Sequence, residues 1–341
     1  MRSLRGLKLT EQVSFSNSIG AVAIGRNEGE RLRRCLQSLQ TGLKHIVYVD
    51  SGSTDGSVEM AESLGVLVIQ LDMKQSFTAA RARNAGLGAL LQQHPELEYV
   101  QFVDGDCEVQ PEWLSKAFSF MQANIVFAAV CGRRRERFPH KSIYNQLCDI
   151  EWDTPPGEAQ ACGGDALFRI SALKAVNGYR DSLIAGEEPE MCYRMRQLGW
   201  KIMRLDAEMT LHDAAMTRIG QWWKRNQRAG HAYAESYALH GNEQEHFRKK
   251  DTRSIVIWAA LIPLVFVLLG LFDDDLLILW LLYPLQIIRL AFKYTKQLDS
   301  FYLSFLYALS NVLGKWPQLV GVLSFLRNHA SGQQSKLIEY K

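Results

Sequence analysis

The N-terminal half of the chain alternates short apolar runs with amphipathic stretches. The amphipathic stretches carry apolar side chains at helical spacing and lie near residues 28–39, 58–64 and 79–91. The apolar runs that flank them cover residues 19–25, 45–50, 66–71 and 99–104. This strand and helix series predicts an α/β domain with a mostly parallel sheet and helices on both faces.

Further elements are expected beyond this series. A helix beginning at Pro111 and a strand over residues 123–132 come next, followed by an irregular stretch rich in Arg, Pro and Gly. The run Arg133–Arg137 (RRRER) in that stretch could meet anionic lipid or a phosphorylated acceptor, or it could be a solvated loop. One more strand is expected over residues 201–209 (KIMRLDAEM).

Polar turns follow three of the predicted strands. They are residues 25–27 (Gly-Arg-Asn), 50–52 (Asp-Ser-Gly) and 104–106 (Asp-Gly-Asp). Ligands of open α/β sheets bind at the carboxyl ends of the strands. The pattern therefore predicts a binding site at this edge of the sheet.

Two apolar segments near the C-terminus, residues 254–272 and 276–292, each approach the roughly 20 residues that span a bilayer. Asp273–Asp275 separate the two segments. Basic residues lie outside them, at Arg248, Lys249, Lys250, Arg253, Arg289, Lys293 and Lys296. The positive-inside rule then predicts a membrane hairpin with both flanks in the cytoplasm.

A third apolar stretch, residues 301–326, is interrupted by residues 314–317 (Gly-Lys-Trp-Pro). Each half is too short to cross a membrane alone and is expected to lie in the interface or to re-enter. The alternative is that all three stretches form a buried helical domain of a soluble protein. Pro263 and Pro284 near segment centres, with Arg289 inside the second segment, keep that alternative open.

Composition limits the class of protein. A chain of 341 residues that is 47% apolar can bury a full catalytic core, and a net charge of +3 does not suggest a nucleic-acid partner. The six cysteines, which lack metal-binding or redox spacing, are expected to be reduced thiols. The basic N-terminus lacks the apolar core of a secretory signal, so the first domain is expected in the cytoplasm.

Asp104 and Asp106 carry the clearest chemistry. Two hard oxygen ligands after a buried strand can hold Mg²⁺ or Mn²⁺ while diphosphate oxygens fill the remaining positions. An Asp-Gly pair is also a common turn, so the motif alone is weak. In the segment from Asp50 to Gly56, the hydroxyls and carboxylates could cap a helix, or Asp50 and Ser51 could bind a base or ribose.

Six sequence blocks occur in an order and at intervals that resemble glycosyltransferase family 2, in particular its membrane-associated bacterial members. Across about residues 19–240 they read VAIGRNE, VYVDSGSTDGS, ARARNAGL, FVDGDCEV, GGDALFRISALKAVNGY and GEEPEMCYRMRQLGW. The resemblance implies a GT-A fold and sugar transfer with inversion at the anomeric carbon. It also implies a nucleotide-sugar donor, above all a UDP-sugar, and a divalent metal ion, Mn²⁺ or Mg²⁺.

The resemblance assigns a donor side to the site. Ser51 stands where the family often has a second acid, which leaves the nucleotide open. Arg83 could counter phosphate charge, although a solvated helix face is the alternative. Donor or nucleotide contacts are implied for Ala23, Gly25, Asn27, Glu28, Asp50, Ser51, Asp55, Arg83, Asn84 and Asp104, and metal contacts for Asp104, Asp106 and His212.

The resemblance also assigns an acceptor side. Gly163, Gly164 and Asp165 match the acceptor loop, and Glu187 and Glu188 match the acidic pair that supplies the family's base. A carboxylate must take the acceptor's proton, and Glu188 is the expected base. The family more often has Asp there, so Glu187 or Glu190 could be the residue that reaches the acceptor hydroxyl. Alternatively, these acids could only complement the dipole of the helix.

Three later residues complete the implied site. His212 follows the last predicted strand and could contact metal or phosphate, although a lone His is often structural. Arg225 and Arg228 could touch the diphosphate. The segment Gln221–Arg225 has Lys-Arg where processive synthases of the family have Arg-Trp, which argues against a processive synthase.

The resulting prediction is a membrane-attached, metal-dependent transferase acting on a lipid-linked or glycan acceptor in cell-surface polysaccharide or glycolipid synthesis. Residues 1–18 would be an extension, 19–245 the catalytic domain facing the cytoplasm, and 246–341 a helical region at the inner membrane. One alternative is an inactive, transferase-like membrane scaffold. A sugar nucleotidyltransferase fits less well, because Arg26-Asn27 replace the Lys-Ser/Thr of a phosphate loop.

Overall fold

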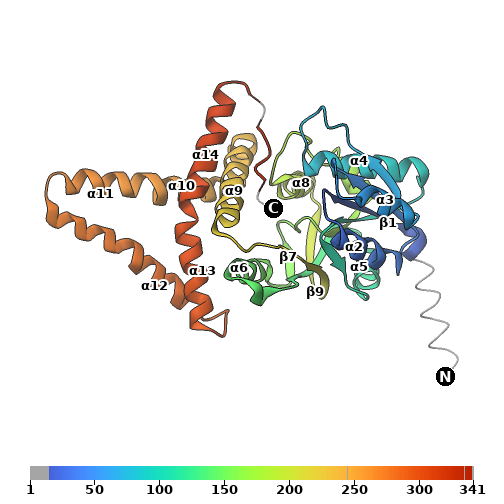
Figure 1. Ribbon diagram of the computed structural model, residues 1–341, viewed down its shortest axis with the longest axis horizontal. Helices are drawn as coiled ribbons and strands as arrows, with labels where there is room; N and C mark the ends of the chain where they lie inside the picture. Colours follow the sequence, from blue (N-terminus) through green and yellow to red (C-terminus); the bar gives the residue numbers. More distant parts are fainter. Residues whose placement is uncertain (1–14, 244, 334, 340–341) are drawn as a thin grey trace. The chain divides into compact units, whose positions relative to one another are not determined.

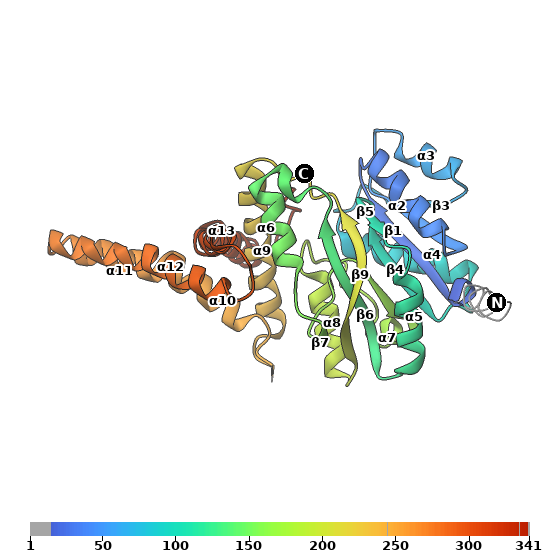
Figure 2. The same ribbon diagram turned by 90° about the horizontal axis from the view of Figure 1, so that it is seen from below.

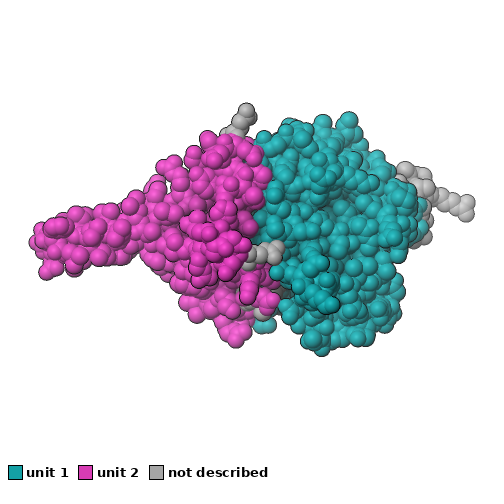
Figure 3. All heavy atoms as spheres, turned by 90° about the horizontal axis from the view of Figure 1, so that it is seen from above, with its two compact units in different colours: residues 1–141, 151–215 teal, residues 142–150, 216–341 magenta. Residues whose placement is uncertain are grey.

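The computed structural model describes residues 15–243, 245–333 and 335–339. Most of the predicted extension over residues 1–18 therefore lies outside the described residues. The chain forms two compact units, coloured in Figure 3: residues 1–141 with 151–215, and residues 142–150 with 216–341. The segment 216–245, predicted with the catalytic domain, groups with the C-terminal helices.

The first unit is built on a nine-stranded sheet with the order β3-β2-β1-β4-β8-β6-β9-β5, and β7 pairs with β9. The strands β3, β2, β1 and β4 run parallel, as the sequence predicts. Beyond them β8 runs antiparallel to β4 and β6, while β9 is parallel to β6 and antiparallel to β5 and β7. Their bounds are β1 Ile19–Gly25, β2 His45–Asp50, β3 Leu67–Gln70, β4 Tyr99–Asp104, β5 Cys107–Val109, β6 Phe127–Glu136, β7 Gly157–Ala159, β8 Ala166–Arg169 and β9 Lys201–His212.

Helices cover both faces of the sheet. Successive strand residues point to opposite faces, yet residues 19–24 of β1 and 46–50 of β2 are all buried. Figure 2 shows α2, α4 and α5 beside the strands. The helices of this unit are α2 Glu30–Gln40, α3 Ser57–Ser63, α4 Ala79–Gln93, α5 Trp113–Ala123, α7 Ile170–Ala175 and α8 Glu187–Gln197, with a 3₁₀ turn η1 at Pro139–Lys141; α6 Ile143–Trp152 joins the two units.

Helix α4, which carries two predicted donor residues, is fixed closely against the sheet. Its N-terminus is capped by the Thr78 hydroxyl, which accepts a hydrogen bond from the Arg81 amide at 3.1 Å. A Cβ added at Gly86 would lie 2.3 Å from Val22 and 2.8 Å from Val49. Only glycine allows this approach, so the helix holds its N-terminal residues in a fixed place over β1 and β2.

The arginine-rich run is not a loop. Strand β6 continues through Arg133, Arg134, Arg135 and Glu136, so the predicted strand end at residue 132 and the solvated loop after it are wrong. Alternate side chains of a strand point to opposite faces, and Arg135 pairs with exposed Glu208 at 2.7 Å while Arg134 points inward. Charge alone suggested a solvated segment, whereas the period of two along the strand places one arginine inside.

The second unit is helical. Figure 1 shows α10, η2 and α11 running outward and η3 and α12 returning as a hairpin. Helix α14 packs along α9, and α12 packs against α13. Their bounds are α9 Ile219–His240, α10 Lys249–Val256, η2 Ile257–Leu261, α11 Ile262–Gly270, η3 Asp274–Leu281, α12 Leu282–Tyr294, α13 Phe301–Leu313 and α14 Lys315–Ala330.

The hairpin contains two helical stretches, Lys249–Gly270 and Asp274–Tyr294, that are long and apolar enough to cross a membrane. In each, only 17% of the most apolar 18 residues is buried. A core helix of a soluble protein would be mostly buried, so the alternative of a buried helical domain does not fit these two stretches.

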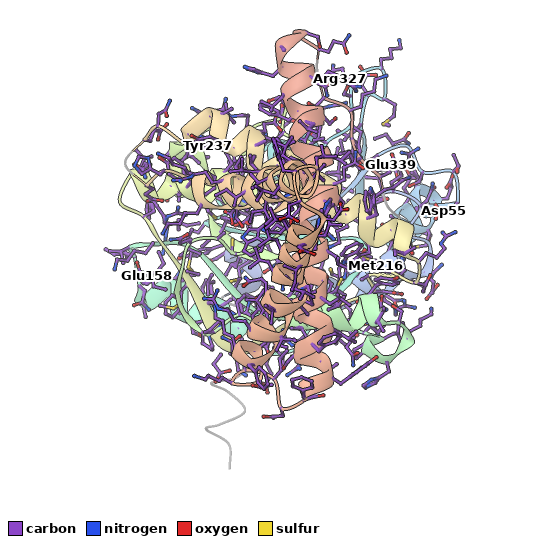
Figure 4. The ribbon with its side chains drawn as sticks, turned by 90° about the vertical axis from the view of Figure 1, so that its left-hand side faces the viewer. Asp55, Glu158, Met216, Tyr237, Arg327 and Glu339 are labelled. Carbon is purple, nitrogen blue, oxygen red and sulfur yellow. The ribbon has the colours of Figure 1, made fainter. Side chains whose placement is uncertain are left out.

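The third apolar stretch is less interrupted than its sequence suggests. Gly314, between α13 and α14, keeps helical angles of φ −60° and ψ −18°, and Pro317 lies in the first turn of α14, where its missing N–H costs no hydrogen bond. The two helices follow one another in Figure 1, and Arg327, labelled in Figure 4, lies near the far end of α14. Whether this stretch lies on, enters or crosses a membrane stays a prediction.

Two glycines let α9 and α14 pack with their backbones close together. A Cβ at Gly230 would lie 2.0 Å from the Gln318 carbonyl oxygen, and one at Gly321 would lie 2.0 Å from that of Gln227. Small residues at facing positions are the usual means by which helices approach closely, both in water and in lipid.

We expect Gly321→Ala to lower the melting temperature of the purified protein in detergent, because overpacking costs about 1–3 kcal/mol, more than alanine's gain in helix propensity of about 1 kcal/mol. Gly220→Ala, on α9 with nothing within 4 Å of the added Cβ, is the matched control and should not lower it. Circular dichroism during heating measures both. Equal melting temperatures for the two variants would contradict the close packing of α9 on α14.

Candidate functional site

The three polar turns meet at one edge of the sheet. In the parallel register Gly25 lies opposite Asp50, and Ile24 lies opposite Asp104. The carboxyl ends of β1, β2 and β4 therefore stand side by side, which confirms that the turns cluster. Beside them, Ala23 is fully buried in β1.

Asn27 joins the first turn to the second. Its backbone N–H donates to the Ser53 hydroxyl at 2.9 Å, and its side-chain oxygen accepts from the Thr54 amide at 2.7 Å. It adopts the left-handed conformation, with φ 55°, which asparagine tolerates better than most residues. Next to it, Glu28 pairs with Arg31 at 2.8 Å.

The carboxylate of Asp50 is occupied by its own turn. One oxygen accepts from the Tyr48 hydroxyl and the other from the amides of Gly52 and Ser53, each at 2.9 Å. This favours the structural interpretation over contact with a base or ribose. Asp55 acts similarly, since it accepts from the Ser57 amide at the start of α3 at 3.1 Å.

Ser51 differs from its neighbours. It is fully buried, and its hydroxyl oxygen makes no hydrogen bond within the described part of the chain. A buried hydroxyl without a partner is uncommon, because desolvation is then not compensated. Ser51 is therefore the member of the second turn that retains a free polar group.

Arg83 bridges two of the predicted site acids. From α4 its guanidinium donates to Asp104 Oδ1 at 2.7 Å and to Glu187 Oε1 at 2.6 Å. Burial by itself lowers the pKa of Arg83, but the carboxylates of Asp104 and Glu187 outweigh burial and raise that pKa above its ordinary value. Arg83 is thus a fixed positive charge in the site, and the alternative of a solvated helix face is wrong.

Asn84 holds a loop instead of facing the site. Its amide nitrogen donates to the Tyr179 carbonyl at 2.7 Å and to Asp181 Oδ1 at 2.6 Å, and its oxygen accepts from the Tyr179 amide at 3.0 Å. All of these partners are protein groups. The arrangement favours a supporting role for Asn84 over contact with a donor.

Asp104 is supported from behind by the predicted acceptor loop. Asp165 is fully buried. One carboxylate oxygen accepts a hydrogen bond from the Asp104 amide at 3.1 Å, and the other accepts one from the Thr210 hydroxyl at 2.9 Å. The Arg134 guanidinium lies 2.9 Å from the second oxygen. Because Asp165 is buried, it is better placed to support the end of β4 than to contact an acceptor sugar. A Cβ at Gly164 would lie 2.9 Å from Asp104 Oδ2, so this position excludes any side chain, while Gly163 has φ 86°.

Strand pairing brings His212 beside Asp106. In the antiparallel register of β5 and β9, Cys107 lies opposite His212, and His212 Nε2 is 3.3 Å from Asp106 Oδ1. The Trp152 ring contacts the imidazole edge-on at 4.7 Å between centroids. Both Asp106 and His212 are buried, so these two groups are held rigidly at the end of β4.

This pair fits a divalent metal ion. Neighbouring ligand atoms of an octahedral ion with bonds of about 2.1 Å lie about 3 Å apart, close to the 3.3 Å between Asp106 Oδ1 and His212 Nε2. The other imidazole nitrogen, Nδ1, makes no hydrogen bond among the described residues and lies 3.9 Å from Glu136 Oε2. An imidazole with a carboxylate behind it is the usual arrangement of a metal-ligating histidine.

The three acids of α8 have different surroundings. Glu187 is ion-paired to Arg83, and buried Glu190 is held by Arg180 and Arg194 at 3.3 and 2.8 Å. Glu188 is also buried, but it lacks a cationic partner among the described residues. Glu187 and Glu190 are therefore each paired with arginine, whereas Glu188 is not.

The carboxylate of Glu188 is held by one oxygen only. Its Oε1 accepts from the Cys162 amide at 2.7 Å and from the thiols of Cys162 and Cys192 at 3.0 and 2.8 Å. Its Oε2 makes no hydrogen bond to any described residue. One oxygen is anchored while the other stays open.

Several contributors to the site were missed from the sequence. Arg134 lay within a run interpreted by its charge, Glu136 and Trp152 belong to no recognised block, and Cys162 and Cys192 were set aside for lack of short spacing. The alternation along β6 could have identified Arg134 and Glu136. Arg225 and Arg228 lie on α9 in the second unit, so their predicted diphosphate contact stays a prediction.

Comparison with known proteins agrees with this geometry. Residues 22–175 match the family model described as "Glycosyl transferase family 2". The chain is 25% identical over 210 residues to the succinoglycan biosynthesis protein ExoA of Rhizobium meliloti, covering 58% of this chain and 64% of that one. It is 24% identical over 231 residues to the glycosyltransferase AglE of Haloferax volcanii, covering 62% and 72%.

One solved structure is similar over most of the chain. It is the mannosyltransferase PcManGT from Pyrobaculum calidifontis in complex with GDP-Man and Mn²⁺, with a TM-score of 0.58, 15% identity and coverage of 91% of this chain and 87% of that one. The likeness shows a shared fold. The chain spans just under two thirds of ExoA.

Proposed function

We propose that the chain is a glycosyltransferase with a family 2 domain of GT-A fold, and that it transfers a sugar from a nucleotide-sugar donor to an acceptor hydroxyl with inversion. The observation that supports this most directly is the meeting of Arg83, Asp104, Asp106 and His212 at the carboxyl edge of the sheet. Arg83 supplies a fixed positive charge, and the other groups supply ligands for a metal cation. Such an edge suits a nucleoside diphosphate, whose negative charge grows as it leaves.

Asp106 and His212, with Asp104 beside them, would hold the divalent ion. The solved relative bound to GDP-Man and Mn²⁺ supports Mn²⁺ or Mg²⁺ for this chain. The ion supplies Lewis-acid stabilisation of the diphosphate when bound. Arg83 adds a positive charge that stays in place because two carboxylates hold it.

On the acceptor side, Glu188 is the proposed base. Its open Oε2 takes the hydroxyl proton as the acceptor oxygen bonds to the anomeric carbon. The bond between that carbon and the diphosphate oxygen breaks on the opposite face, and the electron pair leaves with the nucleoside diphosphate. Three donors on Oε1 keep the carboxylate from turning during this step.

The exposed apolar hairpin suggests where the acceptor lies. Two helices that can cross a membrane would hold the catalytic unit at its surface, where a lipid-linked acceptor is within reach. The name of ExoA supports a role in polysaccharide synthesis. We place the catalytic unit on the cytoplasmic side of the inner membrane, following the basic residues that flank the hairpin.

A donor panel tests the proposed function. Membranes containing the protein should use one labelled UDP- or GDP-sugar, transfer the sugar to a lipid extract, lose activity with EDTA and regain it with Mn²⁺. Nuclear magnetic resonance of the product should show the anomeric configuration opposite to that of the donor.

Each outcome of the donor panel tests a different part of the proposed function. Transfer that persists in EDTA would refute the metal, and transfer only to soluble acceptors would refute the lipid-linked acceptor. A folded protein that uses no donor would move the inactive scaffold to first place.

A further inference from the structure

Two thiols surround the proposed base. Cys162 precedes the glycine pair of the loop before β8, and Cys192 lies one helical turn after Glu188 on α8. Their sulfur atoms are 3.8 Å apart, and both thiols point at Glu188 Oε1. In the proposed reaction both cysteines only hold Glu188 Oε1, and neither is assigned a contact with donor or acceptor.

The spacing of these sulfur atoms is that of two ligands on one tetrahedral ion. With Zn–S bonds of about 2.3 Å, two sulfurs at the tetrahedral angle lie about 3.8 Å apart. A disulfide would instead require them to close to about 2.05 Å. The pair is therefore already placed for an ion, whereas a covalent bond would need movement.

The third ligand is the carboxylate. A zinc-bound oxygen and sulfur lie about 3.5 Å apart when the bonds are about 2.0 and 2.3 Å long. The oxygen to sulfur distances of 2.8 and 3.0 Å would therefore lengthen by roughly 0.5–0.7 Å as the S–H···O hydrogen bonds are replaced. A small rotation of the Glu188 side chain can supply this change.

We propose that Cys162, Cys192 and Glu188 form a binding site for a soft divalent ion of the Zn²⁺ class, separate from the Asp106 and His212 pair. Binding breaks two S–H bonds and forms two metal–sulfur bonds. The two protons go to solvent, and no electron is transferred. The fourth position of the ion is left for water.

Ligand chemistry keeps the harder ions out of the thiol site, although Zn²⁺ can also bind the Asp106 and His212 pair. Thiolate sulfur selects Zn²⁺ over Mg²⁺ or Mn²⁺, whereas carboxylates accept the harder ions readily. Cys162 is the partly exposed member of the trio and gives the ion a way in. Burial raises the pKa of Cys192 to about 11 and holds the pKa of Cys162 well above its usual range, so both protons must be displaced on binding.

An ion at this site would occupy the proposed base. This consequence rests on the proposed function: zinc bound to the two thiols and Glu188 would inhibit transfer, and excess Mn²⁺ would not reverse that inhibition. The binding itself does not depend on activity. Because two protons are released, the apparent affinity for Zn²⁺ should increase by about 100-fold for each unit by which the pH is raised, as long as the pH stays below the thiol pKa values.

Co²⁺ is the probe for the test, because thiolate ligands give it a charge-transfer band in the near ultraviolet. The full-length protein, kept reduced with a phosphine, should show this band on titration with Co²⁺, and Zn²⁺ should remove it. The band should be lost in Cys162→Ser and in Cys192→Ser. Cys148→Ser, a buried cysteine of the second unit, is the matched control and should keep it.

A surface cluster offers a useful contrast. His45, His94 and Glu96 could also take zinc, but they contain no sulfur and give no such band. His94→Gln should therefore leave the band unchanged. A band that survives Cys162→Ser, or no band in folded wild-type protein, would overturn the proposal.

The same samples separate the site from the proposed function. If the band forms but no donor is used, the ion site stands and the transferase mechanism fails. If donors are used, the band forms, and zinc inhibits transfer by the wild type and by Cys148→Ser alike, both stand.

Discussion

Replacement of Asp106 by Asn should lower the rate of sugar transfer by about 10³-fold, because loss of a metal ligand removes several kcal/mol of transition-state stabilisation and each 1.4 kcal/mol is about tenfold. The amide keeps the size of the side chain but is a poorer ligand for Mn²⁺. His212→Gln should act in the same direction, since Nε2 lies 3.3 Å from the same carboxylate.

Asp206→Asn is the control, an exposed acid on the same strand as His212. It should transfer sugar at the wild-type rate. Initial rates at a series of Mn²⁺ concentrations make the measurement. An Asp106→Asn protein with wild-type rate and wild-type Mn²⁺ dependence would remove Asp106 from the metal site.

Replacement of Glu188 by Gln should lower kcat by about 10²–10⁴-fold and leave the KM for the donor nearly unchanged, because general-base catalysis contributes a factor of that size. The glutamine oxygen can still accept from the Cys162 amide, so the loop is expected to stay in place. The loss would then reflect the missing proton acceptor.

Glu187→Gln provides the comparison for the base. Glu187 is paired with Arg83 and not with the thiols, so its loss should act mainly through the donor and raise KM. Separate determination of kcat and KM for the two variants distinguishes them. If Glu187→Gln loses kcat and Glu188→Gln does not, the base has been assigned to the wrong residue.

The parallel half of the sheet could be predicted because β1, β2 and β4 are buried apolar runs that each end in a polar turn, while β3 is a short apolar run that is only partly buried. The antiparallel pairing beyond it could not, although strands over residues 123–132 and 201–209 were expected. Strand β5 has only three residues, and its partner β9 comes much later in the chain. No local sequence pattern therefore predicts that these two strands pair. This pairing brings His212 beside Asp106, whereas the pairing of β6 with β9 brings it beside Glu136.

Motif residues were predicted better than their roles. The matched blocks include Asp50, Asn84 and Asp165, yet the side chain of each residue forms hydrogen bonds with other groups of the protein. A sequence block records that a residue type is needed at a position. It does not distinguish a side chain that touches a ligand from one that shapes the place where the ligand lies.

The pairing of β5 with β9 also sets an order of events during synthesis. Asp106 leaves the ribosome about a hundred residues before His212, and the closure of so long a loop carries an entropic cost that local contacts do not repay. A nascent chain that ends before β9 therefore has Asp104 at the end of β4 and Asp106 in the turn after it, but only half of the metal-binding pair. The divalent ion should accordingly stabilise the finished sheet by mass action and have little part in guiding its assembly.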